Sequence, residues 1–172
     1  MERKRLPLAE VLKTVTSVCE DLAVVHSKGT AHGGLDTSKL WVTDQGMVKL
    51  TDFVLSRKMR SPSASGPTAD AFWAQAFQAP EMGGASPQGD VWGLGVAIYE
   101  MLCGMVPFPA PSPQAKATRA FAKAGSLVPG LPASMDMLFH RALDPDPRSR
   151  ISLEEFSTLM EEADRALSSA RH

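Results

Sequence analysis

The longest stretch that is hydrophobic on every side lies in the middle of the chain, over residues 86–104. Ser86 can cap a helix, Pro87 suits its first turn, and Gly104 stands where a helix would stop. The pattern therefore predicts a helix buried inside its own protein, in a run too short to span a bilayer. An unpaired carboxylate at Asp90 would be costly there, so we expect it to accept backbone hydrogen bonds from elsewhere in the chain.

Amphipathic and alternating patterns flank this central helix. Over residues 7–28, hydrophobic residues recur at helical spacing and Gly29 follows them, which predicts a long helix. Two short apolar runs, residues 40–42 and 48–50, are joined by a turn that contains glycine and predict a hairpin. Further helices are predicted in the C-terminal part, at about 113–124, near 133–143 and from Ser152 onward.

Charge and cysteine content narrow the classes of function. The 172 residues include 18 basic and 19 acidic side chains, a net charge of -1, so nothing favours a nucleic acid or an anionic membrane as a partner. Cys19 and Cys103 both fall in apolar helical surroundings, which argues against a disulfide framework and favours a reducing, cytoplasmic compartment. The four histidines have no metal-ligand spacing with the cysteines, and we expect neither a metal nor another cofactor.

Five short motifs follow one another along the chain. His-Gly-Gly-Leu-Asp-Thr-Ser-Lys begins at His32, Thr-Asp-Phe-Val follows the hairpin, Ala-Pro-Glu ends at Glu81, Gly-x-x-Pro-Phe begins at Gly104, and Asp-Pro-Arg-Ser-Arg-Ile-Ser ends at Ser152. Each motif alone is weak, because such short strings occur by accident in many proteins. In this order and spacing, over residues 7–167, they resemble the protein kinases from the catalytic loop onward.

The resemblance implies a mainly helical fold, a protein-kinase-like C-terminal lobe with one small β-hairpin around a buried central helix. The whole chain, residues 1–172, would form this single domain. Its parts would be the long helix at 7–28, the catalytic loop, hairpin and Asp-Phe-Val at 29–55, an activation-segment-like loop at 56–81, the central helix at 86–104 and a helical remainder at 113–170. No glycine-rich loop or strand lysine of the family precedes the first helix, so we expect the N-terminal lobe to be absent.

The catalytic positions implied by the resemblance depart from the family's pattern. Gly34 stands at the base aspartate, Asp36 inverts the charge of the phosphate-facing lysine, and Lys39 puts a cation where Mg²⁺ needs an oxygen ligand. Asp52 keeps the other metal carboxylate, but Val54 replaces a flexible glycine. Asp36 is displaced too far to act as the general base, and its plainer interpretation is an Asx-turn or a partner for Lys39. From these changes, and from the missing glycine-rich loop and N-lobe lysine, we expect a chain that is not an enzyme.

Other positions match residues that hold the family's fold together. His32 and Phe53 correspond to two residues that stack in the core spine, and Asp90 corresponds to the residue that anchors that spine to the central helix. Glu81 and Arg150 correspond to a buried ion pair between the activation segment and the late helices. The resemblance thus implies that the frame is kept while the catalytic residues are changed.

Three features are candidates for a positive function. Trp41 aligns with the residue that floors adenine, and its indole would partly fill that pocket, stand exposed as part of a surface that binds a protein partner, or pack under the N-terminal helix. Trp73 and Phe77 lie where the family forms a shelf for a substrate peptide, and would hold a peptide or pack on the central helix. A polar loop is either a plain linker or a target of another kinase. Its candidate phosphorylation sites are Ser61, Ser63, Ser65 and Thr68.

Taken together, the sequence predicts a catalytically inactive, pseudokinase-type module that acts as an interaction or regulatory scaffold. Its protein partner would be a kinase or a chain that supplies an N-terminal lobe, with no nucleic acid and no membrane insertion. The alternative is the C-terminal part of a larger or split serine/threonine-kinase-like enzyme that binds ATP when its N-terminal lobe is present. A decaying sequence without selected function is a third interpretation, which the intact buried pattern disfavours.

Overall fold

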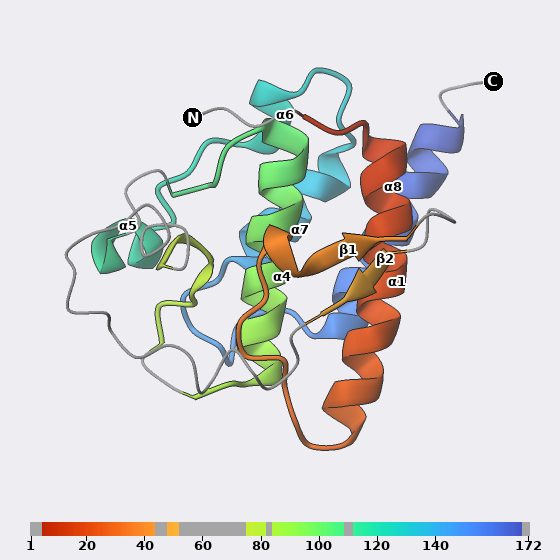
Figure 1. Ribbon diagram of the computed structural model, residues 1–172. Helices are drawn as coiled ribbons and strands as arrows, with labels where there is room; N and C mark the ends of the chain where they lie inside the picture. The colour runs from red at the N-terminus through yellow and green to blue at the C-terminus, as the bar shows by residue number, and fades with distance from the viewer. Residues whose placement is uncertain (1–4, 44–47, 52–74, 82–83, 109–111, 170–172) are drawn as a thin grey trace.

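The fold is given by a computed structural model, which describes residues 5–43, 48–51, 75–81, 84–108 and 112–169. In chain order the elements are α1 (Leu8–Ser27), the 3-10 helix η1 (Thr37–Lys39), β1 (Leu40–Val42), β2 (Val48–Leu50), α4 (Pro87–Cys103), α5 (Pro113–Ala117), α6 (Ala124–Leu127), α7 (Ala133–Ala142) and α8 (Leu153–Ser169). Helix α4 runs through the middle of the molecule, with α1 and the hairpin on one side of it (Figure 1). The mainly helical fold with a small hairpin, predicted from the sequence, is confirmed for these residues.

Helix α4 is the centre of the core because its sequence leaves no polar face. It packs against α1, α6, α7 and α8, and every residue from Asp90 to Glu100 is buried. The Ser86 hydroxyl caps the helix by accepting a hydrogen bond from the Gly89 amide at 3.0 Å. Gly104 ends it with a left-handed φ of 75°, a conformation that glycine adopts without steric cost.

Helix α1 joins the hairpin to the rest of the core. Its buried side chains recur at helical spacing, as predicted, and include Val11, Val15, Val18 and Leu22. The helix contacts α4, α8 and β2. The strands β1 and β2 pair antiparallel, with Leu40 opposite Leu50 and Trp41 opposite Lys49. The hairpin therefore turns Leu50 into the core and leaves the other face of its strands to solvent.

The C-terminal helices close the other side of α4. Helix α8 begins with a capping box, in which the Glu155 amide donates to the Ser152 hydroxyl at 3.1 Å and the Ser152 amide donates to the Glu155 carboxylate at 3.0 Å. Between α4 and α7, Tyr99 meets Phe139 edge to face, with ring centroids 5.2 Å apart. These contacts fix the positions of the loops that follow α4 and α7.

The helix predicted at about 113–124 is wrong in its extent. Helix α5 covers only Pro113–Ala117, and the chain then turns at Arg119, whose φ is 51°. The turn lets Arg119 pair with Asp144 and lets Phe121 pack edge to face on Tyr99. These tertiary contacts outweigh the local preference for a continuous helix. In the part of the chain that the structure describes, no helix combines the length and hydrophobicity that a membrane crossing needs.

Alanine substitutions of two methionines in α7 test which face of this helix belongs to the core. Met135 is fully buried, whereas Met137, two residues later, is 54% exposed. We expect Met135→Ala to lower the free energy of unfolding by about 2–5 kcal/mol, because the lost side chain leaves a cavity. Met137→Ala is the matched control and should change it by less than about 0.5 kcal/mol. Urea denaturation of both variants measures the difference, and equal losses would contradict this description of the core.

Candidate functional site

The site is built on a buried carboxylate at the start of α4. Asp90 is almost fully buried, and its two oxygens accept hydrogen bonds from the backbone amides of His32 and Gly33, both at 2.8 Å. His26, at the end of α1, contacts the same carboxylate through Nε2 at 2.9 Å. As expected from the sequence, Asp90 is held by backbone from elsewhere in the chain. It ties the end of α1 and the loop after it to the central helix.

His32 links the same loop to the hairpin. Its ring is buried, and Nε2 donates to the Thr51 carbonyl at 2.8 Å, just after β2. The next residue, Gly33, has a left-handed φ of 73°, and a Cβ there would lie 2.3 Å from the Cβ of Ala85. Only glycine fits this backbone without a shift of one of the two segments. The loop is thus fixed at both His32 and Gly33.

The altered catalytic positions lie directly after this fixed point. Gly34 is half-buried and presents only backbone. Asp36 caps η1, because its Oδ1 accepts hydrogen bonds from the amide and the hydroxyl of Ser38. This is the Asx-type turn that the sequence offered as the plainer interpretation of Asp36. Lys39 is half-buried, and its carbonyl accepts from the Thr51 amide at 2.9 Å.

The predicted ion pair between Glu81 and Arg150 is present. The Arg150 side chain is completely buried and binds both carboxylate oxygens of Glu81, at 2.7 and 2.8 Å. The same guanidinium donates to the carbonyls of Gln88 and Asp144 and lies 5.1 Å above the ring centre of Trp92. One cation therefore joins the Ala-Pro-Glu segment, the start of α4 and the loop after α7.

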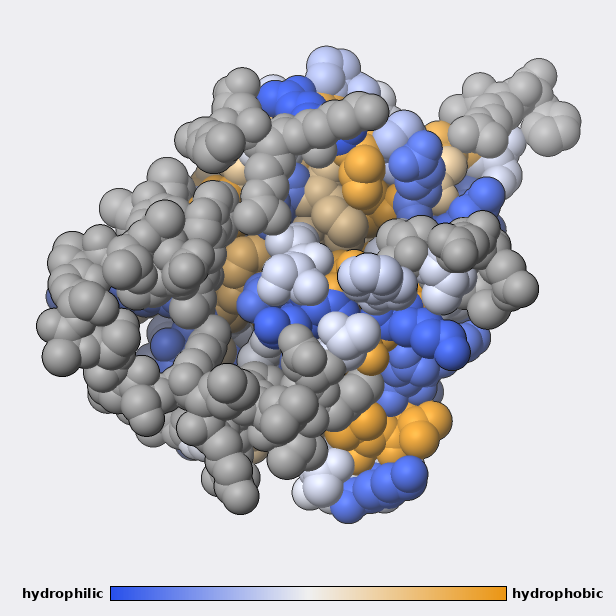
Figure 2. All heavy atoms as spheres, in the orientation of Figure 1, coloured by the Kyte–Doolittle hydropathy of each residue, from blue (hydrophilic) through white to orange (hydrophobic). Residues whose placement is uncertain are grey.

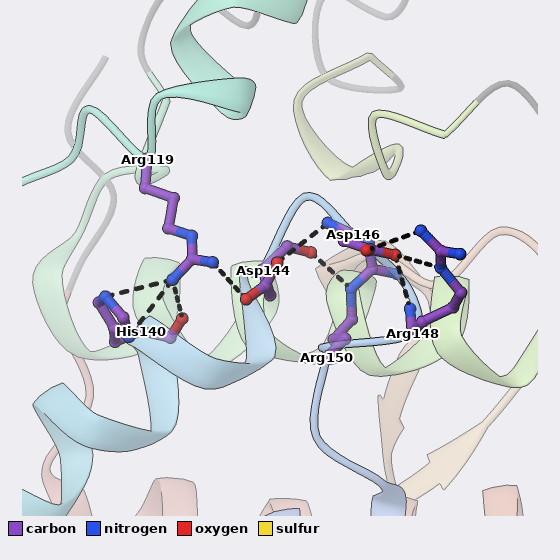
Figure 3. A network of polar contacts seen from close by, with 6 residues as sticks. All are labelled: Arg119, His140, Asp144, Asp146, Arg148 and Arg150. Carbon is purple, nitrogen blue, oxygen red and sulfur yellow. Dashed lines mark hydrogen bonds and ion pairs between the residues drawn. The ribbon is translucent and has the colours of Figure 1, made fainter.

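The loop that carries Arg150 is itself held by acidic side chains (Figure 3). Asp144 pairs with Arg119 and accepts the Asp146 amide at 3.0 Å. Asp146 pairs with the Arg148 guanidinium and also accepts the Arg148 amide at 3.0 Å, and these hydrogen bonds lower the pKa of Asp146. The carboxylates act locally on this loop, so Arg150 approaches Glu81 from a fixed backbone.

A pocket lies between the loop after α1 and the Ala-Pro-Glu segment. It has a volume of about 90 Å³. One wall is Gly33–Leu35, the other is formed by Phe77–Ala79 and Glu81, and Gly84–Ser86 and Gly89 complete the lining. Phe77, which the sequence offered as a peptide-shelf residue, is buried and lines this pocket. The described wall residues other than Glu81 are uncharged, and Glu81 is neutralised by Arg150. The pocket thus suits a small uncharged group.

Sequence reasoning missed Lys116. This residue of α5 is only 3% exposed, and its Nζ donates to the carbonyls of Gln75 and Gln78 at 2.7 and 2.6 Å. Burial lowers the pKa of Lys116 to about 8, and the nearby Glu81 carboxylate partly offsets this. No local signal predicts the contact, since a lysine in a short polar helix is normally exposed.

Trp41 stands on the outer face of the hairpin. It is 67% exposed, so the alternative in which it packs under the N-terminal helix is wrong. Its cross-strand neighbour is Lys49. Figure 2 shows polar side chains beside the hairpin and a hydrophobic group at the C-terminal end of α1, where Val24 is also exposed.

Several predicted site residues lie outside the described part of the chain. They are Asp52, Phe53, Val54, Ser61, Ser63, Ser65, Thr68 and Trp73. Among the described residues no group of three His, Cys, Asp or Glu could hold a metal ion. At Lys39, where the resemblance implies an oxygen ligand for Mg²⁺, the side chain instead ends in an ammonium group. Both cysteines are buried and free, and burial raises the pKa of each to about 11, which leaves them poor nucleophiles.

Comparison with known proteins agrees with this arrangement. A family model described as "Protein kinase domain" matches residues 1–160. "Serine/threonine-protein kinase PknL" of Mycobacterium tuberculosis is 30% identical over 157 residues, which cover 87% of this chain and 39% of that protein. "CBL-interacting serine/threonine-protein kinase 20" of Arabidopsis thaliana is 32% identical over 135 residues, which cover 76% of this chain and 30% of that protein. The chain thus spans about two fifths or less of these relatives.

These relatives overturn the expectation that the chain is not an enzyme. A third, "Probable serine/threonine-protein kinase CPE1738" of Clostridium perfringens, is 26% identical over 155 residues, which cover 87% of this chain and 23% of that protein. All three carry the names of kinases, which points to an enzyme. The expectation depended on the missing glycine-rich loop and N-lobe lysine and on the loop positions Gly34, Asp36 and Lys39, whereas the similarity extends over most of the chain.

Arg150 and Arg148, in the same loop, allow the contribution of a buried ion pair to stability to be compared with that of a surface ion pair. Arg150→Ala should lower the free energy of unfolding by about 3–5 kcal/mol, because it leaves the Glu81 carboxylate without its partner. Arg148 is the matched control, since its side chain is 89% exposed and a solvent-exposed ion pair such as that with Asp146 contributes little to stability. Thermal and urea unfolding of both alanine variants compare the two. Similar stabilities would contradict the structural role of Arg150.

Lys116 gives stability a defined pH dependence. Its pKa is about 8 in the folded chain against an ordinary 10.5, so between these values the unfolded chain binds more protons and stability rises with pH. From pH 7 to pH 9, the free energy of unfolding should rise relative to that of Lys116→Met by on the order of 1 kcal/mol. Urea titrations of both proteins at each pH measure this difference, in which shared groups cancel. A difference that stays flat or falls would show that Lys116 titrates normally.

Proposed function

This chain belongs to the protein kinase domain family, and from that premise we propose that it is the C-terminal, peptide-facing part of a serine/threonine-kinase-like enzyme. It binds ATP when an N-terminal lobe is present. The observation that carries the proposal is the hold of Asp90 on the backbone of His32 and Gly33, at 2.8 Å each. A loop held in this way keeps its position without help from substrate, as positioning catalysis requires.

In this proposal the peptide lies against the pocket between Gly33–Leu35 and Phe77–Glu81. The segment ending at Glu81 is fixed by Arg150, and the opposite loop is fixed by Asp90, so both walls are held from α4 or its neighbours. A small uncharged side chain fits the volume of about 90 Å³. The peptide therefore meets two rigid backbones, which lowers the entropic cost of binding.

Gly34 limits the rate of the proposed reaction. Residue 34 has no side chain to accept the proton of a hydroxyl group, and the Asp36 carboxylate is engaged with Ser38. General-base assistance contributes typically about 10²–10⁴-fold to rate. The proposed enzyme keeps binding and positioning and transfers phosphate more slowly than a kinase with a base at this position.

Trp41 marks the side that the N-terminal lobe and the nucleotide cover. Its indole is exposed on β1 and offers a flat surface on which a base can stack. The lobe comes either from the same polypeptide or from a second chain, which makes that chain the protein partner. The intact mass of the endogenous protein, compared with the 18.5 kDa of this chain, distinguishes the two cases.

Nucleotide binding by the complete natural polypeptide tests the proposal. We expect Mg-ATP to raise its melting temperature. Trp41→Ala should weaken ATP binding roughly tenfold, because stacking of a base on an aromatic ring is worth about 1–3 kcal/mol. Val24→Ala is the control, since Val24 is similarly exposed but lies on α1. Calorimetric titration with Mg-ATP gives the affinities. If neither the endogenous protein nor its complex with a lobe-bearing partner binds ATP, the proposal is wrong.

A further inference from the structure

Lys116 lies at the rear of the pocket wall that the proposed peptide would touch. It comes from α5, which Ser112 caps by accepting the Ala115 amide at 3.1 Å. Its Nζ donates hydrogen bonds to the carbonyls of Gln75 and Gln78, which belong to the described segment that leads to Glu81. Phe77, Gln78 and Ala79 of the same segment line the pocket directly. Lys116 thus contacts the backbone that sets the shape of this wall.

Charge strengthens this contact. Backbone carbonyl oxygens accept hydrogen bonds, and the lysine ammonium group is a charged donor, so a contact with two carbonyls is favoured. Glu81 is the carboxylate that acts on Lys116, and it is already paired with Arg150. The hydrogen bonds of the Lys116 ammonium group therefore go to backbone carbonyls, whereas Glu81 forms its ion pair with Arg150. Such charge-assisted hydrogen bonds are short and strong, and both distances here are below 2.8 Å.

We propose that Lys116 is a positioning residue that fixes the Gln75–Ala79 wall of the pocket and thereby sets the affinity for peptide. The inference depends on the proposed function, because it assumes that peptide binds between this wall and Gly33–Leu35. Arg150 holds the far end of the wall through Glu81, and Lys116 holds its near end. Loss of the Lys116 side chain releases only the near end of the wall. We therefore expect the affinity for peptide to fall and the affinity for nucleotide to stay unchanged.

The test uses the complete natural polypeptide with Mg-ATP and the best peptide from a degenerate serine/threonine peptide array. Lys116→Met keeps the length of the side chain without its donors, and Lys116→Arg keeps both the charge and the donors. Lys116→Gln, a milder neutral variant with an amide donor, serves if the methionine variant does not fold. Lys123→Met is the matched control, because Lys123 is exposed and the pocket does not include it.

We expect Lys116→Met to raise the KM for peptide about tenfold, with the KM for ATP changed less than twofold. Lys116→Gln should fall between, and Lys116→Arg and Lys123→Met should resemble the natural protein. A general loss of structure would instead raise the KM values for both peptide and ATP, and Lys116→Arg would show the same increase as Lys116→Met and Lys116→Gln. An unchanged peptide KM in Lys116→Met and Lys116→Gln overturns this inference alone. If the natural protein binds ATP but no peptide, both the inference and the proposed peptide site fail.

Discussion

The structure depends on one buried carboxylate. Asp90 lies in the first turn of α4, where the unpaired amides of the helix favour a negative charge. Its burial would be costly without partners, and the amides of His32 and Gly33 and the ring of His26 supply them. Because these partners come from the end of α1 and the loop after it, the charge can be satisfied only when α1, the loop and α4 are in their folded arrangement.

A second buried charge, that of Arg150, joins segments that are distant in sequence in the same way as Asp90 does. Arg150 binds Glu81 and the Gln88 carbonyl, so the Ala-Pro-Glu segment and the start of α4 meet at one guanidinium. Replacing such a pair by apolar side chains can be neutral for stability, but a hydrophobic pair would not fix direction as a planar bidentate contact does. The two charges together hold the two walls of the pocket at a set separation. Lys116 adds a third fixed point, on the pocket wall that contains Gln78.

Patterns of residues close in sequence predicted much of this molecule. The caps of α4, the spacing of α1 and the two short apolar runs of the hairpin strands are local signals, and each acts over a few residues. The early end of α5 could not be predicted, because it depends on contacts with residues distant in sequence. Arg119 pairs with Asp144, and Phe121 packs on Tyr99. The Arg150 pair came only from the family resemblance, since no spacing rule relates positions so distant.

The contacts of Lys116 show the limit of such reasoning more sharply. A lysine acquires a buried role only when its fold places carbonyls within reach, and carbonyls have no signature in sequence because every residue carries one. The expectation of inactivity had a similar limit, because it rested on missing N-lobe elements and on the side chains at Gly34, Asp36 and Lys39, and not on the backbone contacts of the loop. The loop of this chain is positioned by backbone amides on Asp90. Changes of its side chains therefore alter the chemistry that the loop can supply without altering where the loop stands.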